Sequence, residues 1–390
     1  MVIAFLLAQL VLPGPPSSPI QPPGMICVSG SCERGPMVYR TSASRSRLVV
    51  ACDMRSDTCS DGRRITTTRS TPVPCEVSPG VWEMVPEDTG CYSVRGLEVW
   101  RANTSYLSYG TELDRSPWGA LRGGTIEALA DGYRITSAAG ESGVSGRIQV
   151  LSTQPEEGPV TLSCIVRTQQ PIGRLTLEAG SGVVRHFAPF DTAGKWEIVS
   201  VSGTVAAEAA RWVSVGPRNT DLTPASVDVK ACWLTRTDTP GRACWGGEAP
   251  VTCAADRHTI STEGWPTEAG EISVTFSPGP SDTHQYIIDG RAPGDTTGKT
   301  LLLVERLQKR LRFDIVPGQA VTGPILEVGR WYVTKIVVRD GRTRVLLDGV
   351  EVINVEGTPQ FALTATIGNR FEQDEPLNGS ISSLRVRSFE

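Results

Sequence analysis

The sequence predicts an all-β chain with two β-sandwiches in series behind a small disulfide-rich N-terminal module. Three observations support this prediction. Apolar and polar residues alternate with period two through much of 96–390, and Gly and Pro, at 40 and 28 residues, separate the alternating runs. The ten cysteines lie mostly in pairs that are close in sequence. Period-two alternation indicates half-buried strands, and short strands between turns are typical of sandwiches.

Composition predicts where the domains begin and end. A chain of 390 residues can form two or three domains with cores of their own. The stretch 24–95 has six of the cysteines and few aliphatic residues, so disulfides are expected to replace a large core there. The predicted segments are an apolar tether or signal-like segment with a Pro-rich linker (1–23), the Cys-rich module (24–95), the first sandwich (96–242), a linker with a disulfide (243–263) and the second sandwich (264–390).

The N-terminal segment has two interpretations. The apolar run Val2–Leu12 is too short to cross a bilayer as a helix, so no membrane span is expected. It has the length of a signal-peptide core, but no Lys or Arg precedes it and no clear small-x-small cleavage site follows. The alternative is an apolar tether that is buried against a partner subunit or a larger particle. Pro13–Pro23 is expected to be an extended linker.

The cysteine spacing favours disulfides, which persist in oxidising surroundings such as a cell exterior or a virion surface. Each bond is expected to stabilise the fold by about 2–4 kcal/mol. A zinc site is less well supported, because there is no Cys-x-x-Cys and there are three histidines, His186, His258 and His284. Reduced, buried thiols are the remaining alternative. The close pairs are Cys27 with Cys32, Cys52 with Cys59, Cys75 with Cys91, and Cys244 with Cys253.

Cys164 and Cys232 are the two cysteines left over, and the strand pattern supports their pairing least. Cys164 shares the inward parity of Val160, Leu162 and Val166. Cys232 instead alternates with the apolar set of its own strand, which is Val227, Val229, Ala231 and Trp233.

The last 120 residues show the clearest strand pattern. Ile272, Val274 and Phe276 alternate with polar residues. Asp340-Gly341 and Asp348-Gly349 each separate two β-rich runs, which is a strong hairpin signal and predicts a three-stranded meander. Within 96–242, only Thr204–Trp212 resembles a helix.

Several motifs in this C-terminal stretch carry a resemblance. They are Gly329-Arg-Trp-Tyr, Arg344-Val-Leu-Leu-Asp-Gly-Val-Glu-Val, Ile367-Gly-Asn and the closing Asn378-Gly-Ser-Ile-Ser-Ser-Leu-Arg-Val. Together they resemble the laminin-G-like, concanavalin-like family, which implies a jelly-roll sandwich over about 120 residues. The resemblance specifies a fold and not a ligand.

A second resemblance lies upstream. Gly96-Leu-Glu-Val-Trp-Arg-Ala-Asn, followed by Glu112-Leu-Asp and Trp118, looks like an element of bacteriophage tail-fibre and virion surface proteins, and so does Ala254-Ala-Asp. The chain departs from that pattern in having Arg101-Ala-Asn for Ala-Arg-Thr-Asn and in its extra cysteines. The resemblance implies a carbohydrate-module-like jelly roll for the first sandwich, and a homo-oligomer, most often a trimer.

Three enzyme signatures are incomplete or absent in the sequence. Gly298-Lys299-Thr300 resembles the end of a phosphate-binding loop, but the required first glycine is Pro293 and a strand-like run follows. No Gly-x-Ser-x-Gly nucleophile elbow occurs. Glycoside hydrolysis needs two carboxylates across a cleft, and the acidic cluster at 372–375 is followed by Pro376 and is interpreted as a solvated loop.

Two kinds of binding site remain as expectations. Calcium accepts irregular loop ligands, and its candidates are Asp289, Asp295 and Asp374. Sugar binding needs aromatic platforms, and aromatic residues in turn-rich segments are its candidates: Trp245, Trp265, Tyr286 and Phe371. The alternative is that these rings pack between domains. Trp196, Trp212, Trp233 and Trp331 lie in predicted strands and are assigned to the core.

Together these observations predict a non-enzymatic phage virion protein. It would be a fibre, spike or capsid decoration that displays lectin-like sandwiches to a bacterial surface glycan or to other virion proteins. The alternative is a secreted bacterial glycan-binding protein or glycoside hydrolase. A net charge of −4 gives no phosphate-binding field, so nucleic acid is not expected as a partner.

Overall fold

The computed structural model divides into two compact units, Met1–Arg45 and Ser46–Glu390, and each is described by itself. In the first unit, β1 (Met25–Val28) pairs antiparallel with β2 (Ser31–Arg34), with the Cys27 backbone opposite Cys32. Their side chains, and with them the predicted disulfide, lie outside the described residues, as does the whole of 1–24. The structure describes residues 25–28, 31–34, 46–139, 143–144, 146–150, 158–168, 173–179, 184–205, 211–219, 224–238, 240–247, 251–292, 300–315, 319–371 and 375–389.

The all-β prediction is confirmed. Strands, turns and irregular segments make up all of the described residues, without a helix among them. In that part of the chain there is accordingly no helix that is long and apolar enough to span a membrane. The helix-like stretch Thr204–Trp212 ends β18 and begins β19, and its middle, 206–210, lies outside the described residues.

The first sandwich has a six-stranded and a five-stranded antiparallel sheet. In spatial order the six-stranded sheet contains β10 (Trp118–Leu121), β14 (Gly146–Val150), β19 (Arg211–Asn219), β16 (Gly173–Ala179) and β17 (Val184–Phe190), and β13 (Gly143–Val144) also pairs with β19. The five-stranded sheet contains β11 (Thr125–Leu129), β12 (Gly132–Thr136), β20 (Ser226–Thr235), β15 (Gly158–Arg167) and β18 (Glu197–Val205). Their inner faces share one buried core that includes Trp118, Ile135, Leu162 and Val213.

The C-terminal sandwich has a seven-stranded and an eight-stranded sheet. The seven-stranded sheet contains β27 (Ala320–Ile325), β26 (Arg310–Asp314), β25 (Leu301–Val304), β24 (Gln285–Asp289), β31 (Thr364–Ile367), β22 (Arg257–Ser261) and β4 (Thr66–Thr68). The eight-stranded sheet contains β30 (Val350–Glu356), β29 (Arg342–Leu347), β28 (Tyr332–Arg339), β23 (Gly270–Ser277), β32 (Gly379–Phe389), β8 (Gly96–Val99) and β7 (Cys91–Ser93), and β3 (Ser46–Asp53) also pairs with β32.

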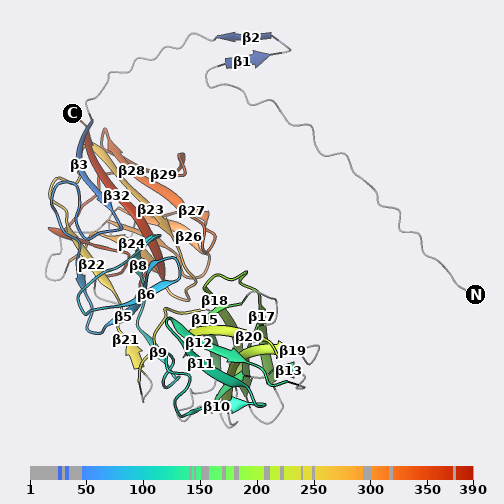
Figure 1. Cartoon of the computed structure of the whole chain (residues 1–390). Helices are drawn as coiled ribbons and strands as arrows, with labels where there is room; N and C mark the ends of the chain where they lie inside the picture. Colours follow the sequence, from blue (N-terminus) through green and yellow to red (C-terminus); the bar gives the residue numbers. More distant parts are fainter. Residues whose placement is uncertain are drawn as a thin grey trace, which may run out of the picture. The chain divides into compact units, whose positions relative to one another are not determined.

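Early residues therefore complete the C-terminal sheets. β3 and β8 pair with the last strand, β32, and β4 pairs with β22. In Figure 1 the blue strand β3 lies beside the red strand β32. Part of the stretch that was predicted as a separate Cys-rich module thus belongs to the C-terminal sandwich. The domain boundaries at 24, 96, 243 and 264 remain predictions.

In the second unit, two short two-stranded sheets lie outside the large sheets. β5 (Val73–Ser78) pairs with β6 (Val81–Val85), and β9 (Asn103–Ser105) pairs with β21 (Val251–Cys253). The disulfides Cys75–Cys91 and Cys244–Cys253 pack together in one small buried cluster beside them. Cys52–Cys59 is also formed, as the spacing predicted.

The Cys164–Cys232 disulfide is formed as well, and a β-bulge explains why the strand pattern gave it little support. Ile165 lies opposite Ala231, but Val166 lies opposite Val229, so Lys230 is an extra residue in β20. An extra residue reverses the inward and outward alternation beyond it. Val229 and Cys232 therefore face the same core, while Ala231 and Trp233 face the other side of the sheet. The predicted inward set of this strand was wrong from Ala231 onward.

The predicted C-terminal meander is confirmed. β28, β29 and β30 are consecutive antiparallel neighbours. Both turns have the left-handed backbone that Asp-Gly hairpins require, with φ of 53° and 71° at Asp340 and Gly341 and of 50° and 84° at Asp348 and Gly349.

Candidate functional site

The outer face of the five-stranded sheet of the first sandwich is apolar at its centre. Ile165 of β15 and Ala231 and Trp233 of β20 point away from the main core, yet each is at most 1% exposed. A sheet face that is this apolar must be covered by other residues. Three tryptophans from distant parts of the sequence cover it, namely Trp82, Trp196 and Trp245, and each of them is itself only partly buried.

Trp233 of the sheet, Trp245 and Trp82 form a row of neighbouring rings. The centroid of the Trp245 ring lies 6.0 Å from that of Trp233 and 5.9 Å from that of Trp82, at interplanar angles of 54° and 59°. Tilted rings at this separation attract each other through their quadrupoles. The row holds Trp245, in the irregular segment before β21, against Trp82 of β6.

Charged residues surround the third tryptophan. The Arg167 guanidinium lies 4.4 Å from the centroid of the Trp196 ring, and the Lys230 ammonium lies 5.0 Å from it. The indole N–H of Trp196 donates to Asp131 at 3.0 Å. Lys230, the extra residue of the bulge, also donates to the Gly80 carbonyl at 2.8 Å, and burial lowers its pKa. Because Lys230 follows the inward Val229, it lies on the outer face of the sheet, beside Trp196.

Gly80 permits the close approach of the β5–β6 hairpin to Trp196. Its φ of 73° is a left-handed conformation that glycine adopts without strain. A Cβ at this position would lie 3.1 Å from Cδ1 of Trp196. A side chain there would push the hairpin away from the sandwich.

Together these residues line an open groove of about 810 Å³ between the hairpin and the first sandwich. We call it the tryptophan groove, and define it by Trp82, Trp196, Trp245, Arg167, Lys230 and Asp131. Aromatic walls with a few fixed donors and acceptors are the usual composition of a ligand site. The indole rings can contact an apolar face of a ligand. The cations Arg167 and Lys230 and the anion Asp131 can bind its polar groups.

The four aromatic residues predicted to bind sugar lie in different places. Trp245 lines the groove. Trp265 is 5% exposed, inside the C-terminal core, where it packs edge-on against Phe361 at 5.0 Å. Tyr286 and Phe371 are 6% and 8% exposed and both lie against Arg291. A role in sugar binding stays a prediction for all four, and Trp265 presents no face to a ligand.

Sequence reasoning missed two tryptophans of the groove. Trp196 was assigned to the core and Trp82 was not considered. A signal for Trp196 was present, because it lies two residues after the turn Ala193-Gly194, where both residues have positive φ. Trp233 is buried as predicted, whereas Trp331 was assigned to the core and is 40% exposed.

The predicted calcium ligands do not converge within the described residues. Asp289 is fully buried and accepts two hydrogen bonds from the Arg291 guanidinium, at 2.8 and 2.7 Å. Asp295 and Asp374 lie outside the described residues. In the part of the chain that is described, no group of three or more acidic, histidine or cysteine side chains could hold a metal ion. The calcium site stays a prediction.

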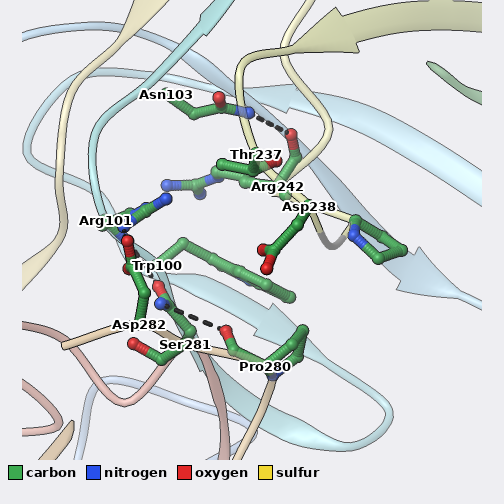
Figure 2. Close-up of a pocket in the computed structure, with 12 residues that line it drawn as sticks. Trp100, Arg101, Asn103, Thr237, Asp238, Arg242, Pro280, Ser281 and Asp282 are labelled. Carbon is green, nitrogen blue, oxygen red and sulfur yellow. Dashed lines mark hydrogen bonds and ion pairs between the residues drawn. The ribbon is translucent and has the colours of Figure 1, made fainter. Parts of the chain in front are cut away.

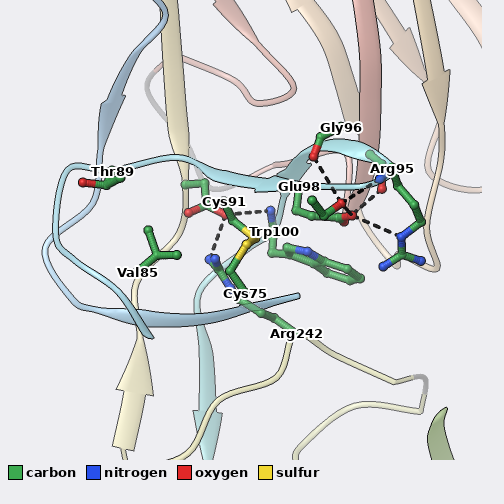
Figure 3. The surroundings of a disulfide bond; sticks show 12 residues. Cys75, Val85, Thr89, Cys91, Arg95, Gly96, Glu98, Trp100 and Arg242 are labelled. Carbon is green, nitrogen blue, oxygen red and sulfur yellow. Dashed lines mark hydrogen bonds and ion pairs between the residues drawn. A yellow bond between two sulfur atoms is a disulfide. The ribbon is translucent and has the colours of Figure 1, made fainter. Parts of the chain in front are cut away.

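A buried ion cluster lies near the Cys75–Cys91 disulfide. Asp256 accepts from Arg69 and from Arg242, each at 2.7 Å, and from the backbone N–H of Trp100 at 3.2 Å. Burial raises the pKa of Asp256, but Arg242 and Arg69 outweigh it and hold that pKa below its ordinary value. Figure 3 shows the disulfide next to Trp100 and Arg242, with Arg95 reaching Glu98. The cluster joins segments far apart in sequence and has a structural role.

A second small cavity lies where Trp100 and Arg101 meet the loop at Pro280. Figure 2 shows Arg101 paired with Asp282, at 2.7 Å, and the Asn103 amide donating to the Arg242 carbonyl, at 2.9 Å. Its volume is about 20 Å³, which is enough for one water molecule. It is therefore too small for a sugar or a cofactor.

Comparisons with known proteins give distant likenesses. No protein-family model matches the chain, and no curated protein matches it. Among solved structures, it is similar to domain 4 of a GH43 extracellular arabinanase from Geobacillus stearothermophilus in complex with arabinotriose, with 16% identity, a TM-score of 0.29 and coverage of 37% of this chain and 73% of that one.

Two further solved structures match a longer part of the chain. The CBM22-1–CBM22-2 tandem domain of Xyn10C from Paenibacillus barcinonensis has 11% identity and a TM-score of 0.26, over 75% of this chain and 98% of that one. Domains LG4-5 of the mouse laminin alpha1 chain have 12% identity and a TM-score of 0.24, over 68% and 91%. At this level of similarity the functions of these proteins do not transfer to the chain.

Proposed function

We propose that the chain is a non-enzymatic glycan-binding protein that holds a glycan in the tryptophan groove. The observation that carries the proposal is the convergence of three partly exposed tryptophans in one open groove. The C–H faces of sugar rings stack on indole rings, and Arg167, Lys230 and Asp131 offer donors and acceptors to the hydroxyls. An open groove of about 810 Å³ suits several sugar residues of a chain better than one enclosed monosaccharide.

Two carboxylates beside Arg167, Asp131 and Asp228, are already paired, which supports a binding role without catalysis, and the exposed Glu83 also lines the groove. A glycosidase needs one carboxyl that protonates the leaving group and a second carboxylate across the cleft. Asp131 accepts from the Trp196 indole at 3.0 Å. Asp228 accepts from Arg134 at 2.9 Å and from Arg167 at 2.8 Å, so it orients a groove cation.

The proposed location is outside the cell or on a virion surface. Four disulfides among the described residues suit an oxidising environment. Within this proposal, the resemblance of the Gly96-Leu-Glu-Val element to phage virion proteins favours a fibre, spike or decoration protein, and a trimer would multiply weak affinity through avidity. Finding the chain in purified phage particles would support that location. Finding it only in bacterial culture medium would favour the secreted alternative.

The binding role is tested on an array of bacterial surface glycans, followed by calorimetry with the strongest glycan. We expect Trp82→Ala and Trp245→Ala each to weaken binding about 30-fold, equivalent to roughly 2 kcal/mol for an aromatic at the centre of an interface. Trp331→Ala is the matched control, because this tryptophan is 40% exposed on the C-terminal sandwich and should leave affinity unchanged. Full affinity in the Trp82, Trp245 double variant would refute the groove.

The absence of catalysis is tested separately on the same glycan. We expect no release of reducing ends during prolonged incubation with the full chain. Turnover that is abolished by Asp131→Asn would instead favour the glycoside hydrolase alternative.

A further inference from the structure

A second pocket lies on the outer face of the seven-stranded sheet of the C-terminal sandwich. Along β25, Leu302 and Val304 point into the main core, whereas Leu301 and Leu303 point to the opposite face. On that face, the two leucines and Tyr286 form a separate buried cluster. They belong to the walls of a pocket of about 240 Å³, which also has Arg291, Arg312, Asp314 and His284 in its lining.

Each arginine of the pocket is held in place by one aspartate. Arg291 donates through Nε and Nη2 to the two carboxylate oxygens of Asp289, at 2.8 and 2.7 Å. Arg312 donates through the same two nitrogens to Asp314, at 2.7 and 2.8 Å. Because both pairs are bidentate, the guanidinium planes are fixed before any ligand arrives.

The cations of these pairs are accessible and the anions are not. The Arg291 and Arg312 side chains are 24% and 29% exposed, whereas those of Asp289 and Asp314 are 0% and 8% exposed. A ligand in the pocket therefore meets guanidinium N–H groups, which can only donate. It must present acceptor oxygens to them.

The neighbouring charges set how selective this pocket can be. Glu305 lies 3.8 Å from Nη1 of Arg312, and Arg370 pairs with Glu375 at 3.0 Å. Three arginines face four carboxylates here, a formal net charge of −1, so attraction of an anion must come from the placement of the cations in front of buried carboxylates. His284 accepts the backbone N–H of Arg306 at Nδ1, at 3.2 Å, which leaves Nε2 as the ring nitrogen that can donate.

We propose that this pocket binds one acidic sugar residue of the uronic acid class. Its carboxylate accepts N–H groups from Arg291 and Arg312, and the apolar face of its ring lies on Leu301 and Leu303. Planar, bidentate arginines are suited to carboxylates. The volume, about 240 Å³, is below the usual range of drug-sized ligand sites, which suits a single residue.

This inference goes beyond the proposed function, because the pocket is on the C-terminal sandwich and shares no lining residue with the tryptophan groove. An experiment can therefore refute ligand binding at one of the two sites without refuting it at the other. If both bind, the chain holds one glycan, or two neighbouring glycans, at two points.

The test is ligand-observed NMR titration of the full chain with sodium glucuronate and with glucose. We expect glucuronate to bind about tenfold more tightly than glucose, since hydrogen bonds to a charged group exceed neutral ones. This preference should shrink in high salt. Equal affinity for the two sugars, or no binding of glucuronate, would overturn the proposal.

Two variants locate the binding. Arg312→Gln with Asp314→Asn removes one whole pair, so no unpaired buried carboxylate remains, and should weaken glucuronate binding about tenfold. Leu301→Phe fills the pocket and leaves every charge in place, and should have at least as large an effect. Unchanged binding in both variants would contradict the site.

Two controls separate this pocket from other surfaces and from the groove. Arg342→Gln removes an arginine that is 50% exposed on the other sheet and paired with Glu356, and should bind glucuronate normally. Trp82→Ala should also bind it normally. Loss of glucuronate binding in Trp82→Ala would place the acidic sugar in the groove and overturn the second site.

Discussion

At the scale of single residues, His258 is the side chain that most directly couples folding to pH. It is fully buried in β22, and its Nδ1 lies 3.0 Å from the hydroxyl of Thr67. Burial lowers the pKa of His258 to about 4, with the neighbouring Arg69 and Arg242 adding to that effect and Asp256 opposing it. The folded protein therefore holds this ring neutral at pH values where an unfolded chain would protonate it.

We expect the free energy of unfolding to fall as the pH decreases from about 6.5 to about 4. The unfolded chain binds the proton near pH 6.5 and the folded chain near pH 4, so stability is complete above the window and decreases through it. The loss should reach roughly 3 kcal/mol at the lower end. The measurement is urea denaturation at a series of pH values.

The His258→Gln variant is the comparison, because it keeps a polar partner for Thr67 and removes the titration. Its pH profile should be flatter than that of the original protein across this window. Asp256 does not contribute to the slope in this window, because its pKa is held below its ordinary value of 3.8. The stability that its charged form contributes is therefore lost at lower pH. Parallel profiles would show that His258 does not set the slope.

The tryptophan groove shows what sequence reasoning can and cannot give for single residues. Trp245 was a candidate because it lies in a turn-rich segment. The same criterion applies to Trp196, which lies shortly after the turn Ala193-Gly194. Trp82 could not be placed, because its setting depends on the contact of its hairpin with residues more than 100 positions away. Likewise, Trp265 follows a turn yet is covered by Phe361, which is distant in sequence.

At the scale of elements, alternation predicts a strand well until a bulge interrupts it. β23 keeps the predicted pattern, with Ile272, Val274 and Phe276 all buried. In β20 the extra residue Lys230 reverses the pattern, and nothing in the local sequence distinguishes a bulged lysine from an outward one. The pairing of Cys164 with Cys232 therefore depends on one backbone insertion that alternation could not reveal.

We expect deletion of Lys230 to leave the Cys164–Cys232 disulfide intact. Without the extra residue, Ala231 directly follows Val229, so regular alternation keeps Val229 and Cys232 on the same inward face. The measurement is a count of free thiols in the denatured, non-reduced protein, which should stay at the original value. Lys230→Ala, which keeps the bulge, should also show no increase. A rise of two free thiols in the deletion variant would mean that Lys230 is not the residue that the bulge adds.

At the scale of the whole molecule, the C-terminal sandwich is completed by strands from the start of the second unit. The motifs from Gly329 onward predicted its fold correctly as a sandwich. They could not predict that β3 and β8 pair with β32, because those partners lie roughly 280 or more positions apart and carry no local signal of each other. Early residues also enter its core, among them Val50, Met54, Ile65, Leu97 and Val99.

We expect a fragment of residues 264–390 to fail to fold on its own, whereas a fragment of residues 46–390 folds cooperatively. Each fully buried aliphatic side chain contributes ~1.5–3 kcal/mol, so the loss of those five core residues alone approaches the whole stability of a typical domain. The shorter fragment also exposes the unpaired edge of β32, which favours aggregation. Size-exclusion chromatography and thermal melts followed by circular dichroism distinguish the outcomes. If 264–390 were instead monomeric with a cooperative transition, the predicted boundary at residue 264 would stand, and β3, β4 and β8 would have to be additions to a sandwich that is already complete.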